Sequence, residues 1–304
     1  MGTSYNVKFP AVTGVEREAL KAAIDQRLVR VNALMSTYDP TSELSRFNQY
    51  RYDTPFELSE ETLLVINEAI RLGQLSDGVL DVTVGPLVNL WGFGPTMRPE
   101  TIPSEQDILA VRQYVGLDKL AVRGNALIKK HPQLYVDLST IAKGYGVDVV
   151  AELLEQQGIT DYLVEIGGEM RVNGQKGDGS PWLIAIEKPV SNERAVQKVV
   201  SIGDNAIATS GDYRNYYEQD GVRYSHLIDP RTGKPIQHNT VSVTVVTSSS
   251  MTADGLATAF NVMGWDAAIA LAEENDMAVF IIRRIDDTFE EYSSPAFEEL
   301  VTVY

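Results

Sequence analysis

The sequence contains no cysteine and only three histidines among its 304 residues. Without cysteine there are no disulfides, no thiolate catalysis and no zinc sites with sulfur ligands. With only His131, His226 and His238 available, a histidine-based zinc cluster is not expected either. Basic residues are also few: 26 Lys and Arg stand against 42 Asp and Glu, for a net charge of −16. Such a chain is not expected to bind nucleic acid.

Long apolar runs are missing as well. No segment is apolar over the length of a membrane span, and the residues after Met1 do not follow the pattern of a signal peptide. The sequence has 44% hydrophobic and 8% aromatic residues, which is typical of a globular protein. We expect a single domain over residues 1–304, large enough to contain two intimate subdomains.

Helical and strand patterns intermix without a strict βαβ rhythm. This order predicts an α+β fold with mixed and antiparallel sheets and packed helices. Helices are expected at 16–35, 59–75, 104–115, 139–157, 252–264 and 266–274. Strands are expected at 5–9, around a turn at 124–125, and at 134–138, 162–166, 182–187, 198–202, 206–209, 213–217, 223–228, 241–247 and 278–282. Residues 42–48 are expected to form a structured loop. Residues 77–95 are dense in glycine, proline and apolar residues, which suits a segment that cradles a cofactor, although buried connecting loops are more common.

The segment from 134 to 157 reads as a buried strand followed by a helix that Ser139 or Thr140 caps. Free N–H groups at such a helix start form an anion site. Gly144 and Gly146 lie in the first helical turns beside Lys143, although glycine is a poor helix former. Glycine allows a ligand or ion to approach the backbone, and lysine attracts phosphate. Ordinary strand–helix packing with a surface lysine explains the segment equally well.

Asp254 and Thr258 are four residues apart in a predicted helix, so their side chains share one face. A carboxylate and a hydroxyl, completed by a backbone carbonyl and phosphate oxygens, are ligands that Mg²⁺ accepts. The alternative is an acid at a helix start with a threonine packed behind it.

His226 lies in a predicted hairpin, three residues before Asp229. In this setting it is a candidate general base for a hydroxyl nucleophile. A purely structural histidine is the alternative, and the more common one in hairpins. Together with the two preceding segments, this suggests a phosphate-bearing ligand handled with a hard metal ion.

These segments belong to a longer series of blocks whose order and spacing resemble the ApbE family, the FAD:protein FMN transferases. The blocks are 1–5, 35–38 leading to 46–48, 81–87, 137–145, 167–169, 209–213, 225–230 and 252–258. The resemblance runs almost from end to end of the chain. It implies an ApbE-like fold, related to the T-fold.

The resemblance also implies an activity and a set of site residues. The expected reaction is Mg²⁺-dependent transfer of FMN from FAD to a Thr or Ser hydroxyl of an acceptor protein, with release of AMP. Asp254, Thr258 and the carbonyl of Gly146, where family members often have alanine, are the implied Mg²⁺ ligands. His226 is the candidate base for the incoming hydroxyl, and Asp229 is expected to orient it. The implied flavin contacts are Met1, Tyr38, Val79, Leu80, Asp81, Lys143, Val149 and Ser210, with the turn to Tyr213 nearby.

The partner expected from the resemblance is a flavoprotein subunit of a membrane redox complex. Family members are often held by a lipid at the periplasmic face of the bacterial inner membrane. This chain has no lipid-accepting cysteine and begins inside the shared region, so the anchor is expected in a longer precursor. Two other functions use the same residues: an FAD pyrophosphatase that yields FMN and AMP, and a flavin-binding carrier without catalysis.

Overall fold

The computed structural model describes residues 2–94, 102–190, 195–212, 215–219 and 221–304. The chain folds into two compact units. The first contains Met1–Arg30, Ile141–Arg214 and Asn239–Tyr304, and the second contains Val31–Thr140 and Asn215–His238. The expectation that they form a single domain stays a prediction. Within the described ranges, no helix has both the length and the hydrophobicity needed to cross a membrane.

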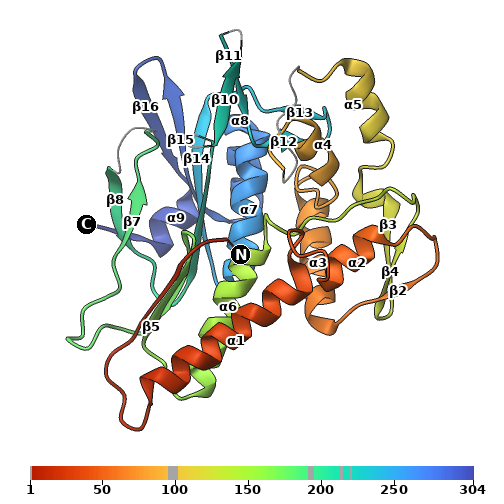
Figure 1. The fold of residues 1–304 in the computed structure, drawn as a ribbon. Helices are drawn as coiled ribbons and strands as arrows, with labels where there is room; N and C mark the ends of the chain where they lie inside the picture. The colour runs from red at the N-terminus through yellow and green to blue at the C-terminus, as the bar shows by residue number, and fades with distance from the viewer. Residues whose placement is uncertain (1, 95–101, 191–194, 213–214, 220) are drawn as a thin grey trace. The chain divides into compact units, whose positions relative to one another are not determined.

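A sheet with the strand order β1-β5-β6-β9-β14-β15-β16 is the centre of the first unit (Figure 1). All neighbouring strands run antiparallel. The strands are β1 (Tyr5–Lys8), β5 (Tyr162–Ile166), β6 (Glu169–Asn173), β9 (Ala206–Gly211), β14 (Thr240–Thr247), β15 (Ala278–Ile285) and β16 (Thr288–Ser293).

Different layers cover the two faces of this sheet. Val164 packs with apolar residues of α1 and α6, whereas its neighbour Leu163 packs with β7, β8 and α9. This separation follows from the alternation of side chains along a strand. The helices are α1 (Arg17–Met35, in this unit up to Arg30), α6 (Ala142–Gln156), α7 (Ser250–Met263), α8 (Trp265–Glu274) and α9 (Pro295–Leu300). A small sheet contains β7 (Ile184–Glu187), β8 (Val196–Ser201) and β17 (Thr302–Val303).

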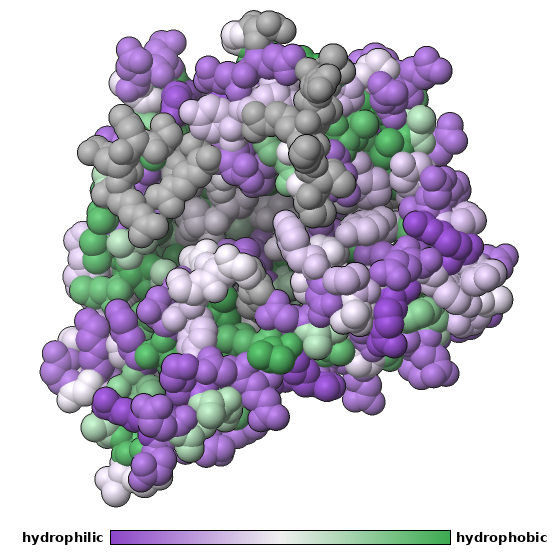
Figure 2. Space-filling model, viewed as in Figure 1, coloured by the Kyte–Doolittle hydropathy of each residue, from purple (hydrophilic) through white to green (hydrophobic). Residues whose placement is uncertain are grey.

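The second unit is mostly helical, with short strands. Its helices are α2 (Glu43–Gln49), α3 (Glu60–Leu75), α4 (Gly85–Leu90), α5 (Glu105–Arg112) and the 3₁₀ helix η1 (Leu117–Lys119). Its strands are β2 (Phe56–Glu57), β3 (Leu120–Arg123), β4 (Ala126–Lys129), β10 (Tyr216–Gln219), β11 (Val222–Ser225), β12 (Ile228–Asp229) and β13 (Lys234–Pro235). Trp91 packs on Tyr224 in one of its apolar clusters. Hydrophilic residues cover most of the molecular face drawn in Figure 2, with apolar residues between them in small groups.

Several helix starts lie where their local signals predict them. The Ser59 side chain accepts a hydrogen bond from the N–H of Thr62 at the start of α3. Ser104 and Asp107 form a reciprocal capping box at α5. The same chemistry corrects one prediction: residues 42–48 are not a loop. Ser42 accepts from the N–H of Ser45 and caps α2.

The predicted strand at 134–138 is also wrong, although Leu134, Val136 and Leu138 are fully buried. The side chain of Asn48 takes the place of a neighbouring strand. It accepts from the N–H of Val136 and donates to its carbonyl, both at 2.8 Å. A buried backbone needs such partners, and here one amide side chain supplies two of them.

Other elements were not predicted. Helix α4 lies inside the expected loop at 77–95, and β16, α9 and β17 follow the last predicted strand. The pairing of β10 with β11 confirms the predicted hairpin in that region. Residues 213, 214 and 220, which belong to the same prediction, lie outside the described residues.

Candidate active site

Lys143 in the first turn of α6 joins two buried carboxylates. Its Nζ lies 2.6 Å from Oε1 of Glu169 and 3.2 Å from Oδ1 of Asp254. The other oxygen of Asp254 accepts from the backbone N–H of Gly144 at 3.0 Å. The side chain that caps α6 is therefore Asp254 from α7. The N-cap residue itself is Ile141, without a side-chain cap bond, so the predicted caps Ser139 and Thr140 are wrong.

Gly144 is required by helix packing. A Cβ atom at this position would lie 2.2 Å from the carbonyl oxygen of Ser250 and 2.7 Å from Cα of Met251. The start of α7 therefore fills the space that the sequence analysis assigned to a ligand or ion at this glycine. The close approach of the two helices is what brings Asp254 to the N–H of Gly144.

Burial and charge set the protonation of this cluster. Asp254 is 5% exposed and Glu169 is 4% exposed. Burial raises the pKa of both carboxyl groups, and for Glu169 the charge of Asp254 raises the pKa further. Burial lowers the pKa of Lys143, but the charges of Asp254 and Glu169 outweigh it, and the net pKa lies above its ordinary value. The lysine is therefore a fixed positive charge.

The carboxylate of Asp148 also connects these two helices, but it lies on α6 and caps α7. Asp148 on α6 accepts from the N–H groups of Ser250 and Met251 and from the hydroxyl of Ser249 at the start of α7. Arg171 on β6 pairs with this carboxylate at 3.2 Å. Each helix thus caps the other, which fixes the positions of Lys143 and Asp254.

The cluster has the charge and the acceptors to bind a cation. Two carboxylates face one lysine, and Oε2 of Glu169 is buried without a hydrogen-bond partner in the described structure. Each oxygen of Asp254 accepts one hydrogen bond and has a lone pair left. Thr258 lies one turn after Asp254 on α7 and is partly buried, and Gly146 is buried in α6.

No group of three or more His, Cys, Asp and Glu side chains in the described residues is arranged to hold a metal. The ligands implied for Mg²⁺ contain only one such side chain, Asp254, together with the hydroxyl of Thr258 and the carbonyl of Gly146. A set with one such side chain does not form a group of this kind, and the metal ligands stay a prediction.

The other flavin contacts expected in the first unit have different surroundings. Val149 is buried within α6. The carbonyl oxygen of Ser210 accepts a hydrogen bond from the side chain of Asn261 at 2.9 Å. Met1 and Tyr213 lie outside the described residues.

In the second unit, Asp81 lines a pocket of about 520 Å³ together with Lys119 and Arg231. Its carboxylate accepts from the N–H and the hydroxyl of Thr83 at 2.7 and 2.6 Å, and burial raises its pKa. The neighbouring Val79 and Leu80 are buried, whereas Tyr38 is 75% exposed. Of these four residues, Tyr38 is the exposed one and Asp81 is the one that lines the pocket.

His226 has a different partner from the one that the sequence analysis expected. Its Nδ1 lies 3.0 Å from the carbonyl oxygen of Asn215. Asp229 instead forms a bidentate ion pair with Arg231, with contacts of 3.0 and 2.9 Å. Burial lowers the pKa of His226. A neutral ring that donates Nδ1–H to Asn215 leaves Nε2 free to accept a proton.

Three residues of this site, Glu169, Asp148 and Arg171, have no role that was predicted from the sequence. Glu169 had a signal, because it follows two consecutive glycines that both adopt positive φ, 62° at Gly167 and 108° at Gly168. Asp148 and Arg171 had none, since their partners are distant in the sequence.

The sequence and the fold both resemble those of known proteins. Residues 1–281 match the model of the ApbE family. An FAD:protein FMN transferase of Vibrio cholerae is 55% identical over 99% of this chain and 91% of its own length. The one from Haemophilus influenzae is 50% identical over 99% of this chain and 89% of its length. The structure of the flavin transferase ApbE from Vibrio cholerae superposes with a TM-score of 0.93 at 55% identity, over 99% of this chain and 96% of that one.

These matches confirm the resemblance, the α+β fold and the expectation of a transferase. Because the family model and both relatives extend over nearly the whole sequence, the chain belongs to the ApbE family.

Proposed function

We propose that this chain transfers FMN from FAD to the hydroxyl of a Thr or Ser side chain in an acceptor protein and releases AMP. Membership of the ApbE family supports the transferase, whose curated relatives are FAD:protein FMN transferases. The observation that carries the proposal is the buried cluster of Lys143, Glu169 and Asp254. In this cluster the ammonium group of Lys143 pairs with both carboxylates, and one oxygen of Glu169 has no hydrogen-bond partner in the described structure.

The reaction is a phosphoryl-type substitution. The acceptor oxygen forms a bond to the phosphorus that carries riboflavin, and the bond from this phosphorus to the bridging oxygen of the pyrophosphate breaks. AMP leaves with the bridging oxygen, and the proton of the hydroxyl passes to a base. His226 is the proposed base, because its lowered pKa keeps the ring neutral near pH 7 and its Nδ1 is held by Asn215.

Mg²⁺ is the proposed metal, and Asp254, Thr258 and the carbonyl of Gly146 are the groups proposed to hold it. When bound, it neutralises charge on the pyrophosphate oxygens. Lys143 contributes a permanent positive charge, and Glu169 holds its ammonium group in place at 2.6 Å. Because Asp148 caps α7 from α6, the ligands on the two helices are kept in register.

One incubation of FAD, MgCl₂ and a candidate acceptor protein tests this function. A gain in acceptor mass equal to FMN, with AMP released, is the expected result. Free FMN with an unchanged acceptor indicates an FAD pyrophosphatase, and unchanged FAD indicates a carrier. Asp254→Asn is expected to abolish the mass gain, whereas Asp266→Asn, the same change at an exposed position of α8, is expected to retain it.

From the family resemblance we also propose that the acceptor is a flavoprotein subunit of a membrane redox complex. The proposed location is the periplasmic face of the inner membrane, with a lipid anchor on the full-length precursor. Fractionation of cells and protease treatment of spheroplasts check this location. Enzyme that stays in the cytosolic fraction contradicts it.

A further inference from the structure

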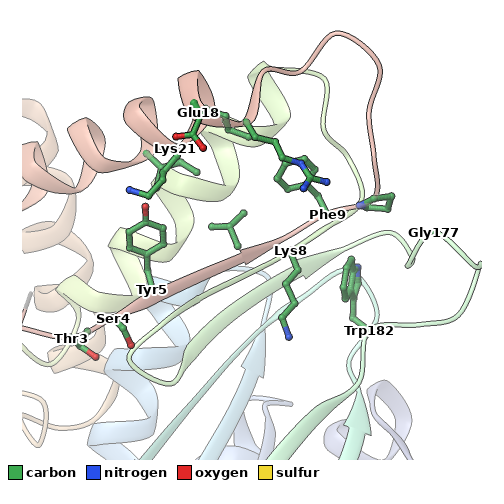
Figure 3. Close-up of a pocket in the computed structure, with 14 residues that line it drawn as sticks. Thr3, Ser4, Tyr5, Lys8, Phe9, Glu18, Lys21, Gly177 and Trp182 are labelled. Atoms are coloured by element: carbon green, nitrogen blue, oxygen red, sulfur yellow. The ribbon is translucent and has the colours of Figure 1, made fainter.

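A pocket of about 920 Å³ opens along β1 in the first unit. Figure 3 shows that its lining comes from both sides of the strand. Tyr5 extends toward Lys21 of α1, while Lys8 extends to the opposite side, where Trp182 lies. A pocket lined from both faces of a strand includes the edge of that strand. Neither Lys143, Glu169 nor Asp254 is among the residues that line it.

This edge of the sheet has free backbone groups. Strand β1 is the first in the sheet order, and no other described strand pairs with its outer side. The N–H of Gly167 donates to the carbonyl of Ser4, and the register pairs Tyr5 with Ile166. Since hydrogen bonding alternates along an antiparallel pair, the N–H and C=O groups of Tyr5 and Val7 point away from β5. An open edge of this kind is a template for another strand.

The charge around the edge is opposite to that of the whole chain. Lys8, Arg17 and Lys21 line the pocket with a single acid, Glu18. Lys21 pairs with Asp25 at 2.6 Å, but no ion pair of Lys8 or Arg17 occurs within the described residues. A pocket lining with three cations and one acid, in a chain of net charge −16, favours an acidic occupant.

The strand also leads to the candidate active site. Thr3, just before β1, touches the turn at Gly167, where an added Cβ would lie 2.9 Å from Cγ2 of Thr3. Two residues further on, Glu169 binds Lys143. An extended chain that follows the edge from Phe9 to Ser4 covers about five residues, or roughly 17 Å. It therefore runs from the Trp182 end of the pocket to the turn that carries Glu169.

We propose that the edge of β1 binds an extended, acidic segment of the acceptor protein as an additional strand of the sheet. The segment bonds to the outward N–H and C=O groups of Tyr5 and Val7, and its acidic residues face Lys8 and Arg17. The hydroxyl that receives FMN lies about five residues along the segment from the Trp182 end. This inference rests on the proposed function and names where its protein substrate docks.

A second copy of this chain is a poor occupant of the same edge. Antiparallel pairing of β1 with its own copy brings both Lys8 and both Arg17 side chains into one groove. Like charges in a paired sheet are destabilising. Each copy also has a net charge of −16, which opposes association.

The test uses an acceptor protein identified by the flavin fluorescence it retains in a denaturing gel, purified without flavin. Val7→Pro removes one outward N–H and leaves the bonds to β5 intact, and Val7→Ala keeps that N–H. Lys8→Glu combined with Arg17→Glu reverses the charge, and Arg123→Glu combined with Arg284→Glu is the matched control at exposed positions. Melting temperatures of all variants verify folding.

Val7→Pro and the Lys8/Arg17 double variant are expected to raise KM for the acceptor at least tenfold, with kcat and KM for FAD unchanged. Val7→Ala and the control double variant are expected to stay within twofold of wild type. In hydrogen–deuterium exchange, the acceptor is expected to protect the amides of Tyr5 and Val7. An unchanged acceptor KM in both variants overturns the inference, as does a dimer of this chain that Val7→Pro disrupts.

Hydrogen–deuterium exchange detects docking of the acceptor without FMN transfer. The docking edge and the proposed function are therefore tested independently. Protection at Tyr5 and Val7 without any FMN on the acceptor supports the docking edge and refutes the proposed function. FMN transfer with no protection at these amides refutes the docking edge and supports the function.

Discussion

Replacing Lys143 with methionine is expected to destabilise the protein, whereas the same replacement at Lys129 is expected to stabilise it. Lys129 is 1% exposed and the side chain of Lys143 is 32% exposed, and their partners also differ. Lys143 has the two carboxylates of Glu169 and Asp254 within 3.2 Å. Lys129 has no carboxylate partner among the described residues: its Nζ donates to the carbonyl of Asn48 at 3.1 Å and lies 4.7 Å from the centre of the Phe47 ring.

At Lys143 the replacement leaves two buried carboxylates without their cation. Removing one partner of a buried ion pair costs roughly 3–5 kcal/mol. The side chain of Lys143 is 32% exposed, so solvent screens part of the interaction and the lower end of this range applies. We expect a loss of about 3 kcal/mol in the free energy of unfolding, measured without metal. Saturation with Mg²⁺ is expected to recover much of it, because the ion replaces the lost positive charge.

At Lys129 the buried positive charge itself destabilises the folded protein. The residue is 1% exposed, and burial, followed by the charge of Arg51, lowers its pKa from 10.5 to about 8. This lowering of the pKa corresponds to roughly 3 kcal/mol at pH values well below 8. Methionine avoids that cost and loses one hydrogen bond worth about 1 kcal/mol. We therefore expect Lys129→Met to raise the free energy of unfolding by about 2 kcal/mol at pH 7.

The pH dependence has a definite sign. Because the folded pKa of Lys129 lies below the unfolded value, the unfolded chain binds the proton more tightly. The stability of the wild type therefore rises as the pH increases from about 8 to 10.5, and Lys129→Met is expected to lack this contribution.

Urea unfolding followed by circular dichroism, at pH 7 and pH 9.5, measures these differences. The difference in the free energy of unfolding between wild type and Lys129→Met is expected to be smaller at the higher pH. Loss of stability in Lys129→Met at pH 7, or an unchanged stability in metal-free Lys143→Met, refutes the reasoning from burial and charge pairing.

Three further outcomes are expected. Mg²⁺ at a hundred times its Kd should stabilise the wild type by about 2.7 kcal/mol in thermal unfolding; Asp254→Asn should lose this response and Asp266→Asn, at an exposed position of α8, should keep it, and a response retained in Asp254→Asn excludes the predicted ligand. If His226 is the base, kcat should fall at acidic pH with an inflection below 6.5, because burial lowers its pKa; an inflection at or above that value contradicts the assignment. Gly144→Ala should cost about 3 kcal/mol of stability through its contact with α7, whereas Gly177→Ala, with no contact closer than 3.6 Å, should be nearly neutral; equal melting temperatures would argue against the close helix packing.

The sequence predicted features that depend on neighbours in the chain. Ser59 and Ser104 cap helices through bonds to residues three positions away, and Asp254 and Thr258 share a helix face because they are four positions apart. The order of the motif blocks was also sufficient to predict the family, which the comparisons confirm.

The features that the sequence did not predict depend on residues that are distant in the sequence. The side chain of Asn48, 88 positions from Val136, makes the hydrogen bonds to Val136 that a neighbouring strand would make. Apolar alternation alone therefore predicted a strand at 134–138 that is not present. Asp254 caps α6 from 110 positions beyond Gly144, so no local pattern revealed it. Burial lowers the pKa of both Lys143 and Lys129, yet the two carboxylates beside Lys143 make its net pKa shift opposite to that of Lys129. The sequence by itself determined local hydrogen bonds and family membership; the tertiary structure decided which charges are buried together, because burial and pairing depend on what the fold places beside each group.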